Sequence, residues 1–448
     1  MSSNKKVVIL VVSSSLLLLL LSFLSQALHF NWQPLNKINL IADVIKYKAD
    51  AEKDSTETVD VVPVIAQKNF SLYKEAGLVT SFFDDTLAVA LPNLMAKLLA
   101  QDTGHHKKIR IAYFGDSMIE GDLITKTIRE LLQKKFGGVG VGFVPITSQA
   151  SKFRTTIAAN YSSGWEDINF KNSGKHNQLF LSGHRFKNAG QWLTVTDLSY
   201  KDTINTCEKY VLLGRGPANS FSVNGYTYPY ATANSFNQLL VANDKNKFIK
   251  VQSLSDTTAF YGVSFESTNG VIVDNFSFRG ISGIEFGTID ADFLNTIAKT
   301  RTYDLIVFQF GVNMLFRPND KNFNWYAKLA KPVLKKFKQA FPTADFILTS
   351  TADRAFRYND KYETAIGIDS LVKTQAAIAY EEGWSFYNLY ATMGGKNTIV
   401  KWAEQDPALA NKDYVHPNQK GAEVVGKLFV ETLLRDYSKY QKQQLKTK

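Results

Sequence analysis

The chain has 448 residues, of which 45% are hydrophobic and 13% aromatic, which excludes an intrinsically disordered protein and allows more than one domain. Its formal charge is +11, but the basic residues form no dense stripe with interleaved aromatic residues, so we expect no nucleic-acid partner. Cys207 is the only cysteine, which excludes an intrachain disulfide and a zinc site made from cysteines; we predict no cofactor and no bound metal.

Residues 1–28 are predicted to be a membrane segment. Lys5 and Lys6 precede an uncharged apolar run of 18 residues, Val7 to Leu24, slightly short for a typical membrane span and slightly long for a signal peptide. The two lysines predict that the N-terminus lies inside and the rest of the chain outside the cytoplasm. We therefore predict a single-pass signal anchor that holds a periplasmic domain at the cell membrane. Secretion after cleavage near Ser25-Gln26-Ala27 is the alternative.

Residues 29–80 are mixed and charged and are predicted to form a stalk or linker, and residues 81–146 the first part of an α/β domain. A helical pattern at Leu87–Ala100 leads into an apolar strand at Ile109–Phe114. The strand ends in Gly115-Asp116-Ser117, and a second helical pattern follows. This order places the serine hydroxyl at the carboxyl end of a strand, where open α/β sheets bind ligands, and near a helix N-terminus.

Residues 147–268 are predicted to form an inserted β-sandwich. They are rich in Ser, Thr, Asn, Gly and aromatic residues, and short alternating runs are separated by turn signals such as Asn224-Gly225. The predicted strands are Gln178–Leu181, Gln191–Val195, Lys209–Leu213, Phe221–Val223, Phe248–Val251 and Ala259–Phe265. Five aromatic residues are candidates for stacking on sugar rings, with packing in the sandwich core as the alternative: Trp165, Trp192, Tyr226, Tyr228 and Tyr230.

Strands and helices alternate again over residues 269–440, and a basic tail follows at 441–448. The run Tyr303–Phe310 is almost wholly apolar, as expected of a parallel strand buried on both faces. Strands are predicted at Val271–Val273, Tyr303–Phe310, Asp345–Thr351 and Trp384–Leu389, and helices at Asn322–Phe341, Lys361–Gly383 and Gln419–Tyr437. This alternation predicts a doubly wound parallel sheet that residues 147–268 interrupt.

Polar residues follow the strands of this predicted sheet. Ser117 follows the first strand, Gly283 the second and Asn313 the third, and Asp413 and His416 precede the last helix. The carboxyl edge of a parallel sheet would bring them together. An imidazole such as that of His416 can take the proton of a serine hydroxyl, and a carboxylate such as Asp413 can fix its tautomer. The N–H groups of Ser117 and Gly283 and the amide of Asn313 are candidate donors to a tetrahedral oxyanion.

Four motifs of the chain resemble, in their order, the four blocks of the SGNH (GDSL-like) hydrolase family: Gly115-Asp116-Ser117, Gly283, Gly311-Val312-Asn313 and Asp413-x-x-His416. The resemblance implies a flavodoxin-like, three-layer α/β/α fold and a serine esterase or acyltransferase. It assigns Ser117 as nucleophile, His416 as base and Asp413 as the orienting partner of His416. It also assigns Gly283 and Asn313 as oxyanion donors.

The insertion and the export signal resemble the peptidoglycan O-acetylesterase branch of this family, in which a carbohydrate-binding-like β-domain interrupts the hydrolase. Met118 and Met314 depart from the common family pattern, and Gly280 is an alternative to Gly283 as the glycine of the second block. The departure at Met314 leaves the amide of Asn313 intact and leaves the substrate subgroup open.

Three hypotheses follow. The first is an exported serine esterase, a carboxylic ester hydrolase that removes O-acetyl groups from a cell-envelope glycan such as peptidoglycan through an acetyl-serine intermediate. The second is a glycan O-acetyltransferase that uses the same Ser-His-Asp site and is supplied by a membrane acyltransferase partner. The third is a non-catalytic glycan-binding envelope protein. The predicted partners are an O-acetylated glycan and the membrane around the N-terminal helix.

Overall fold

The computed structural model describes residues 3–27, 67–84, 88–148, 150, 153–174, 177–199 and 205–446. Its contacts divide the chain into two units, Met1–Ile65 and Ala66–Lys448. Most of the predicted stalk, residues 28–66, lies outside the described residues.

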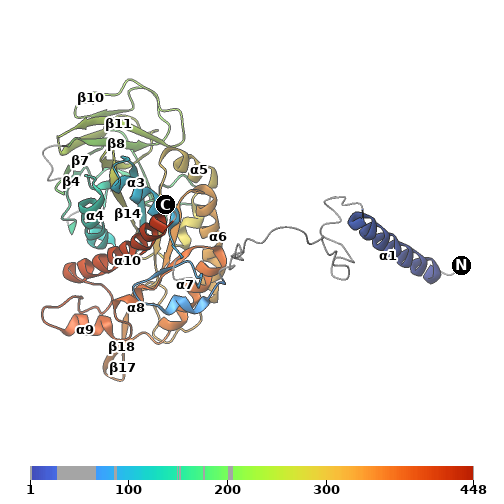
Figure 1. Cartoon of the computed structure of the whole chain (residues 1–448). Coiled ribbons are helices and arrows are strands. Elements are labelled where there is room, and N and C mark those ends of the chain that lie inside the picture. Colours follow the sequence, from blue (N-terminus) through green and yellow to red (C-terminus); the bar gives the residue numbers. More distant parts are fainter. Residues whose placement is uncertain are drawn as a thin grey trace. The chain divides into compact units, whose positions relative to one another are not determined.

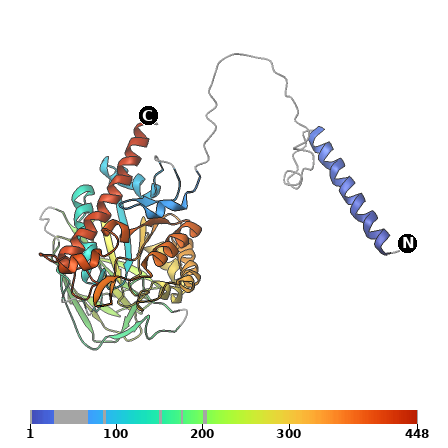
Figure 2. The ribbon, with the colours of Figure 1, turned by 90° about the horizontal axis from the view of Figure 1, so that it is seen from below.

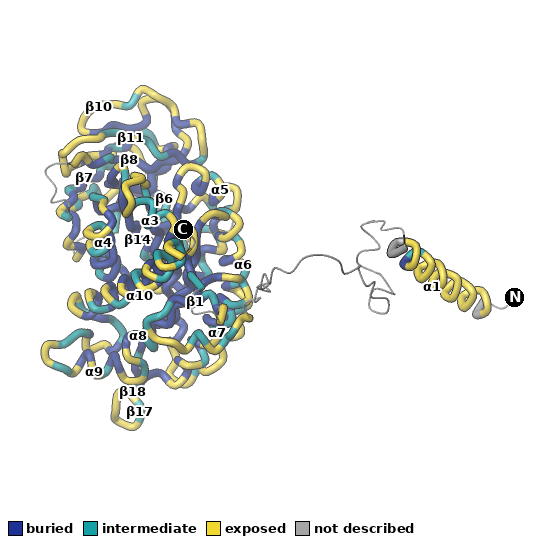
Figure 3. The backbone as a smooth tube through the Cα atoms, viewed as in Figure 1, coloured by how far each residue is buried: buried dark blue, intermediate teal, exposed yellow. Residues whose placement is uncertain are grey.

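The described part of the first unit is one helix, α1 (Ser3–Ala27). Figure 3 shows that its surface is largely exposed, and most of its apolar side chains are exposed as well. Lys5–Leu24 has a mean hydropathy of 2.8 over 20 residues. At about 1.5 Å per residue such a helix matches the hydrocarbon core of a bilayer, and a signal sequence has the same properties.

A six-stranded sheet forms the centre of the second unit. Its strands, in spatial order, are β1 (Val79–Thr80), β19 (Ser385–Tyr387), β16 (Asp345–Thr349), β15 (Leu305–Gln309), β2 (Lys108–Gly115) and β14 (Gly270–Ser277). All neighbours are parallel except β1, which pairs antiparallel with β19. Numbered along the chain, the five parallel strands have the order 2-1-3-4-5 of a flavodoxin-like sheet. The predicted α/β class with a parallel sheet is confirmed.

Helices cover both faces of this sheet, because its strands are apolar on both sides. On β2, Ile111 and Tyr113 pack with one set of helices, and Ala112 and Phe114 pack with the other. The first set is α3 (Pro92–Asp102), α4 (Leu123–Phe136), α8 (Leu389–Met393), α9 (Thr398–Glu404) and α10 (Gln419–Lys446). The second set is α5 (Ala291–Thr300), α6 (Asn324–Ala340) and α7 (Ile368–Glu382). Figure 2 shows α10 running along the rim of the unit to the C-terminal end.

Two antiparallel sheets are formed by the chain between α4 and β14. One contains β10 (Tyr226–Thr227), β9 (Phe221–Val223), β12 (Phe248–Ser253), β7 (Trp192–Asp197) and β4 (Ile157–Tyr161). The other contains β11 (Asn237–Asp244), β8 (Cys207–Leu213), β13 (Phe260–Glu266), β6 (His184–Lys187) and β5 (Glu166–Asn169), with β3 (Gly142–Pro145) paired to β13. The two sheets share one core. In Figure 1 the strands β8, β10 and β11 lie at the end of the unit opposite β17 (Ala355–Tyr358) and β18 (Lys361–Thr364).

A second core continues from the antiparallel sheets into the parallel sheet. Phe143 and Phe180 each pack against Phe276 of β14, with ring centroids 5.1 and 5.7 Å apart, and Phe114 of β2 packs against Phe276 at 5.0 Å. Because this aromatic core is continuous, Ala66–Lys448 forms one compact unit. This division of the chain does not separate residues 147–268 from the rest, so the domain boundaries at 147 and 268 stay a prediction.

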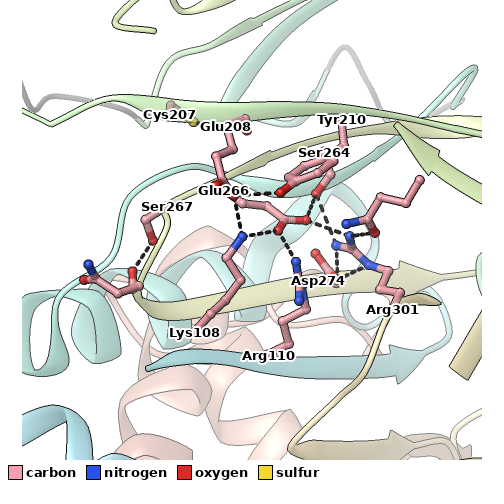
Figure 4. A network of polar contacts seen from close by, with 12 residues as sticks. Lys108, Arg110, Cys207, Glu208, Tyr210, Ser264, Glu266, Ser267, Asp274 and Arg301 are labelled. Atoms are coloured by element: carbon pink, nitrogen blue, oxygen red, sulfur yellow. Dashed lines mark hydrogen bonds and ion pairs between the residues drawn. The ribbon is translucent and has the colours of Figure 1, made fainter. Parts of the chain in front are cut away.

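A buried ionic network also connects the two sheet systems (Figure 4). Arg301, just after α5, donates to Glu266 of β13 and to Asp274 of β14, each at 2.6 Å, and all three side chains have zero exposed area. Lys108 and Arg110 of β2 reach Glu266 from the other side. Burial alone raises the pKa of Glu266, but Arg301 and the other two cations hold that pKa well below its usual range.

Three sequence predictions of local structure are wrong. Gln178–Leu181 is not a strand: the apolar side chains of this segment enter the core from a turn, and the strand lies at β6. The helix predicted from Lys361 begins only at Ile368, after the hairpin β17–β18. The predicted linker extends too far, because Val79–Thr80 pairs with β19.

Candidate active site

Ser117 lies two residues after β2, at the carboxyl end of the parallel sheet. The turn is fixed by Asp116, whose Oδ1 accepts from the Met118 N–H at 2.9 Å and whose carbonyl accepts from the Ile119 N–H at 3.3 Å. A 3-10 turn, η2 (Glu120–Asp122), follows before α4 begins at Leu123. Ser117 is thus presented by a strand end and a tight turn, and the helical pattern that follows it in the sequence forms α4.

The structure brings the predicted Ser117, His416 and Asp413 into one hydrogen-bonded chain. Ser117 Oγ lies 2.8 Å from His416 Nε2, and His416 Nδ1 lies 2.7 Å from Asp413 Oδ2. Asp413 Oδ1 accepts from the N–H groups of Val415 and His416, both at 3.0 Å. Partial burial raises the pKa of Asp413, but these hydrogen bonds outweigh it and hold the pKa below its usual value. An ionised Asp413 keeps the proton on Nδ1, so Nε2 is free to accept the Ser117 proton.

The loop that carries His416 is supported by an element that the sequence analysis missed. Tyr414 adopts a φ of 56°, its carbonyl accepts from the Ala355 N–H at 3.0 Å, and its ring stacks on Tyr362 of the β17–β18 hairpin with centroids 3.8 Å apart. Asn359 and Asp360, at the tip of the hairpin, both have positive φ. This Asn-Asp pair between aromatic residues was the signal for a two-residue hairpin turn.

Two of the predicted oxyanion donors, Asn313 and Gly283, differ in how they are connected to the turn that carries Ser117. Asn313 Nδ2 donates to Asp116 Oδ2 at 3.1 Å and to the Ile281 carbonyl at 2.9 Å. One amide hydrogen is therefore held next to Ser117, and the other is held on the loop of Gly283. Gly283 is buried with a φ of 90°, and an added Cβ would lie 2.7 Å from the Phe310 ring. Among the described residues, no hydrogen bond joins Gly283 to Ser117. The alternative Gly280 is exposed and uncrowded.

A pocket of about 320 Å³ opens beside the triad. Ser117, Asp413 and His416 form part of its wall, and Phe153, 75% exposed, forms another part. The remaining described lining residues are Met118, Glu120, Gly121, Leu123, Ala150, Arg279, Asn411 and Pro417. Asp413 and His416 are themselves 46% and 34% exposed, so both water and a bulky ester can reach the triad.

Asp116 is a buried carboxyl whose burial raises its pKa to about 7. A raised pKa in the folded state gives stability that is complete below the ordinary pKa of 3.8 and is lost as the pH rises to about 7. Asp116→Asn should therefore lessen the fall in unfolding free energy between pH 4 and 7, by up to about 1.4 kcal/mol per pH unit. Urea unfolding at several pH values measures this difference from the wild type.

The matched control is Asp360→Asn, which replaces a carboxylate that is 92% exposed at the hairpin tip and should leave the pH dependence as it is. An Asp116→Asn curve parallel to that of the wild type would contradict the assignment.

The five candidate sugar-stacking residues divide between core and surface. Trp165 is 8% exposed and its Nε1 donates to the Trp192 carbonyl, which fits the core alternative. Tyr228 packs on Phe221. Tyr226 and Tyr230 are 62% and 73% exposed. Among the described residues, no group of three or more His, Cys, Asp or Glu side chains is arranged to hold a metal ion.

No family model and no curated protein matches the chain, but solved structures do. One described as a peptidoglycan O-acetylesterase in action is 20% identical, covers 78% of this chain and 97% of that chain, and has a TM-score of 0.66. A family two carbohydrate esterase from Cellvibrio japonicus is 10% identical, covers 63% of this chain and 98% of that chain, and has a TM-score of 0.26. An acetyl xylan esterase, AlAXEase, is 14% identical, covers 36% and 80%, and also has a TM-score of 0.26.

The first of these likenesses shows the fold: nearly the whole of the peptidoglycan O-acetylesterase structure has a counterpart in this chain. The resemblance to SGNH-type O-acetylesterases that the four sequence blocks predict is therefore confirmed at the level of the fold. The other two likenesses are too weak in shape to carry an argument.

Proposed function

We propose that this protein is a serine esterase that removes O-acetyl groups from a peptidoglycan-like glycan of the cell envelope. The observation that carries the proposal is the chain Ser117–His416–Asp413, with both hydrogen-bond distances under 3 Å, beside an open pocket. The fold shared with a peptidoglycan O-acetylesterase supports the substrate class. The exposed apolar helix α1 supports an anchor or export signal that places the second unit outside the cytoplasm.

In the first half of the reaction, Ser117 Oγ attacks the carbonyl carbon of the acetyl ester while His416 Nε2 takes its proton. Asp413 stabilises the imidazolium that results. The bond between the acetyl carbon and the sugar oxygen then breaks, and His416 returns the proton to that oxygen as the sugar hydroxyl leaves. In the second half, water attacks the acetyl-Ser117 ester with His416 again as base, and acetate and free Ser117 are formed.

The tetrahedral intermediates carry a negative oxygen, for which we propose the N–H groups of Ser117 and Gly283 and the amide of Asn313 as donors. For Asn313, one Nδ2 hydrogen must exchange its present acceptor, Asp116 or Ile281, for the oxyanion. Catalytic hydrogen bonds commonly reach their final geometry only when substrate is bound. The acceptor that remains, Asp116 or Ile281, then holds the other hydrogen and keeps the amide in place.

The test is acetate release by the full-length, detergent-solubilised protein from O-acetylated peptidoglycan, compared with O-acetylated xylan. We expect acetate release from both O-acetylated glycans. The value of kcat/KM should be higher for peptidoglycan than for xylan, because only the sugars and acyl positions of peptidoglycan match the proposed substrate. Preference for xylan would replace the proposed substrate. Acetyl groups appearing on added chitooligosaccharide instead of as acetate would make the protein an acetyltransferase, and no acetyl chemistry at all would leave a glycan-binding protein.

A further inference from the structure

A second cavity, of about 210 Å³, lies where the antiparallel sheets meet the carboxyl end of β14; we name it the junction cavity. Its described wall comes from η2, from β3 to β6 with the segments between them, and from β14 and the two residues after it. Four residues line both this cavity and the pocket beside Ser117: Glu120, Gly121, Ala150 and Arg279. The two are therefore direct neighbours, and a chain-like ligand that occupies one can extend into the other.

Two buried polar atoms in the wall of the junction cavity make no hydrogen bond. They are Nη2 of Arg154, a residue 9% exposed, and Oγ of Ser182, a residue 5% exposed. Arg154 is fixed by its other nitrogens, which donate to Thr156 Oγ1 at 3.0 Å and to the Phe143 carbonyl at 3.4 Å, and Nη2 lies 3.6 Å from Asp122 Oδ2. Both residues line the cavity, and each has one donor that no hydrogen bond within the described residues uses.

His184 adds an acceptor to the same wall. Its Nδ1 lies 2.8 Å from Asp167 Oδ1, and its ring is held by stacking on Phe278 and Phe186, with centroids 4.9 and 5.4 Å away. Asp167 holds the proton on Nδ1, which leaves Nε2 as a hydrogen-bond acceptor. The wall therefore offers a cationic donor, a hydroxyl and an imidazole acceptor. This combination suits the hydroxyl groups of a sugar.

We propose that the junction cavity is a glycan subsite, which holds one sugar residue next to the residue whose acetyl ester lies at Ser117. The inference rests on the proposed function, because it takes the substrate to be a glycan. The cavity volume of about 210 Å³ leaves room for a single sugar residue. The bound residue accepts hydrogen bonds from Arg154 and Ser182 and donates a hydroxyl hydrogen to His184.

Ser182→Ala and His184→Gln in the full-length protein test the proposal. Each removes one hydrogen-bonding group from the wall, so we expect kcat/KM for O-acetylated chitooligosaccharide to fall about tenfold relative to kcat/KM for p-nitrophenyl acetate, which is too small to span both cavities. The loss should lie mainly in KM. Ser255→Ala and His106→Gln, at a half-buried and an exposed position that line neither cavity, are the matched controls and should keep the wild-type ratio. Thermal melting of each variant reports on folding.

Direct binding separates this inference from the proposed function. In a Ser117→Ala background, calorimetry should detect chitotriose binding that Ser182→Ala and His184→Gln weaken about tenfold. Equal binding by these variants would mean a cavity filled by water alone and would overturn the inference, even with the esterase activity intact. Loss of binding in Tyr230→Ala instead would also overturn it, because the glycan would then lie on the exposed aromatic surface. Absence of Ser117-dependent acetate release, with binding retained, would refute only the esterase.

Discussion

Ser117→Ala is expected to lower kcat for p-nitrophenyl acetate by at least about 10⁴-fold. The reason is geometric: Ser117 Oγ is 2.8 Å from His416 Nε2, and His416 in turn is held by Asp413, so the Ser117 hydroxyl is placed to form the proposed acyl-enzyme. The methyl group of alanine fits the same turn, because Asp116 and not Ser117 makes its hydrogen bonds. The variant should therefore fold normally. Steady-state kinetics and labelling by a fluorophosphonate probe measure the loss.

Residues that act as a unit have non-additive effects, which gives a second check. The double variant Ser117→Ala/His416→Ala should be no slower than Ser117→Ala alone. Ser255→Ala, which changes a half-buried serine that does not line the pocket beside the triad, is the control and should be labelled as the wild type is. More than a tenth of the wild-type rate in Ser117→Ala, or labelling of that variant, would show that another residue is the nucleophile.

Arg301→Met is expected to lower the free energy of unfolding by about 3–5 kcal/mol. The substitution leaves the carboxylates of Glu266 and Asp274 buried, with zero exposed area, and without their shared cation. It also removes the Nε–H that donates to Tyr303 OH at 2.8 Å, and leaves that hydroxyl with Asp274 Oδ2 as its acceptor at 2.7 Å. Lys108 and Arg110 remain beside Glu266, but Asp274 loses its only ion pair within the described residues. Urea unfolding monitored by circular dichroism measures the change.

Lys331→Met is the matched control, because it removes a cation from a partly exposed pair with Glu381. Exposed ion pairs contribute about 0–1 kcal/mol, so this variant should be close to the wild type. If Arg301→Met cost no more than Lys331→Met, the network of Figure 4 would not be holding the two sheet systems together.

The sequence was sufficient to predict the parallel sheet and the meeting of Ser117, Asp413 and His416. Both predictions depend on local patterns, namely single apolar runs and the polar residues that follow them. Apolar runs such as Tyr303–Phe310 mark strands buried on both faces, and the carboxyl ends of parallel strands share one edge. Any polar residue that follows such a run is therefore placed near the others.

The polar contacts that surround the triad could not be predicted in the same way. The carboxyl group of Asp116 and the amide of Asn313 are 197 residues apart in the chain, and Arg301 and Glu266 are 35 apart. No periodicity links such pairs. Asp116 and Asn313 meet because β2 and β15 are parallel neighbours, whereas Arg301 reaches Glu266 through the packing of the antiparallel sheets against β2 and β14. The hairpin β17–β18 was missed for another reason, since its two short strands precede a strong helical pattern that concealed the Asn359-Asp360 turn.

The continuous aromatic core and the buried charges restrict motion between the two sheet systems during the reaction. Domains joined by small polar contacts can close over a substrate and open again, whereas an extensive apolar contact suppresses such motion. In this protein the strand that carries Ser117 and the sheets beside it share one interior, so we infer a site without a closing step. An acetylated Ser117 would then stay in contact with bulk solvent throughout its lifetime. Water is then always within reach of such an intermediate.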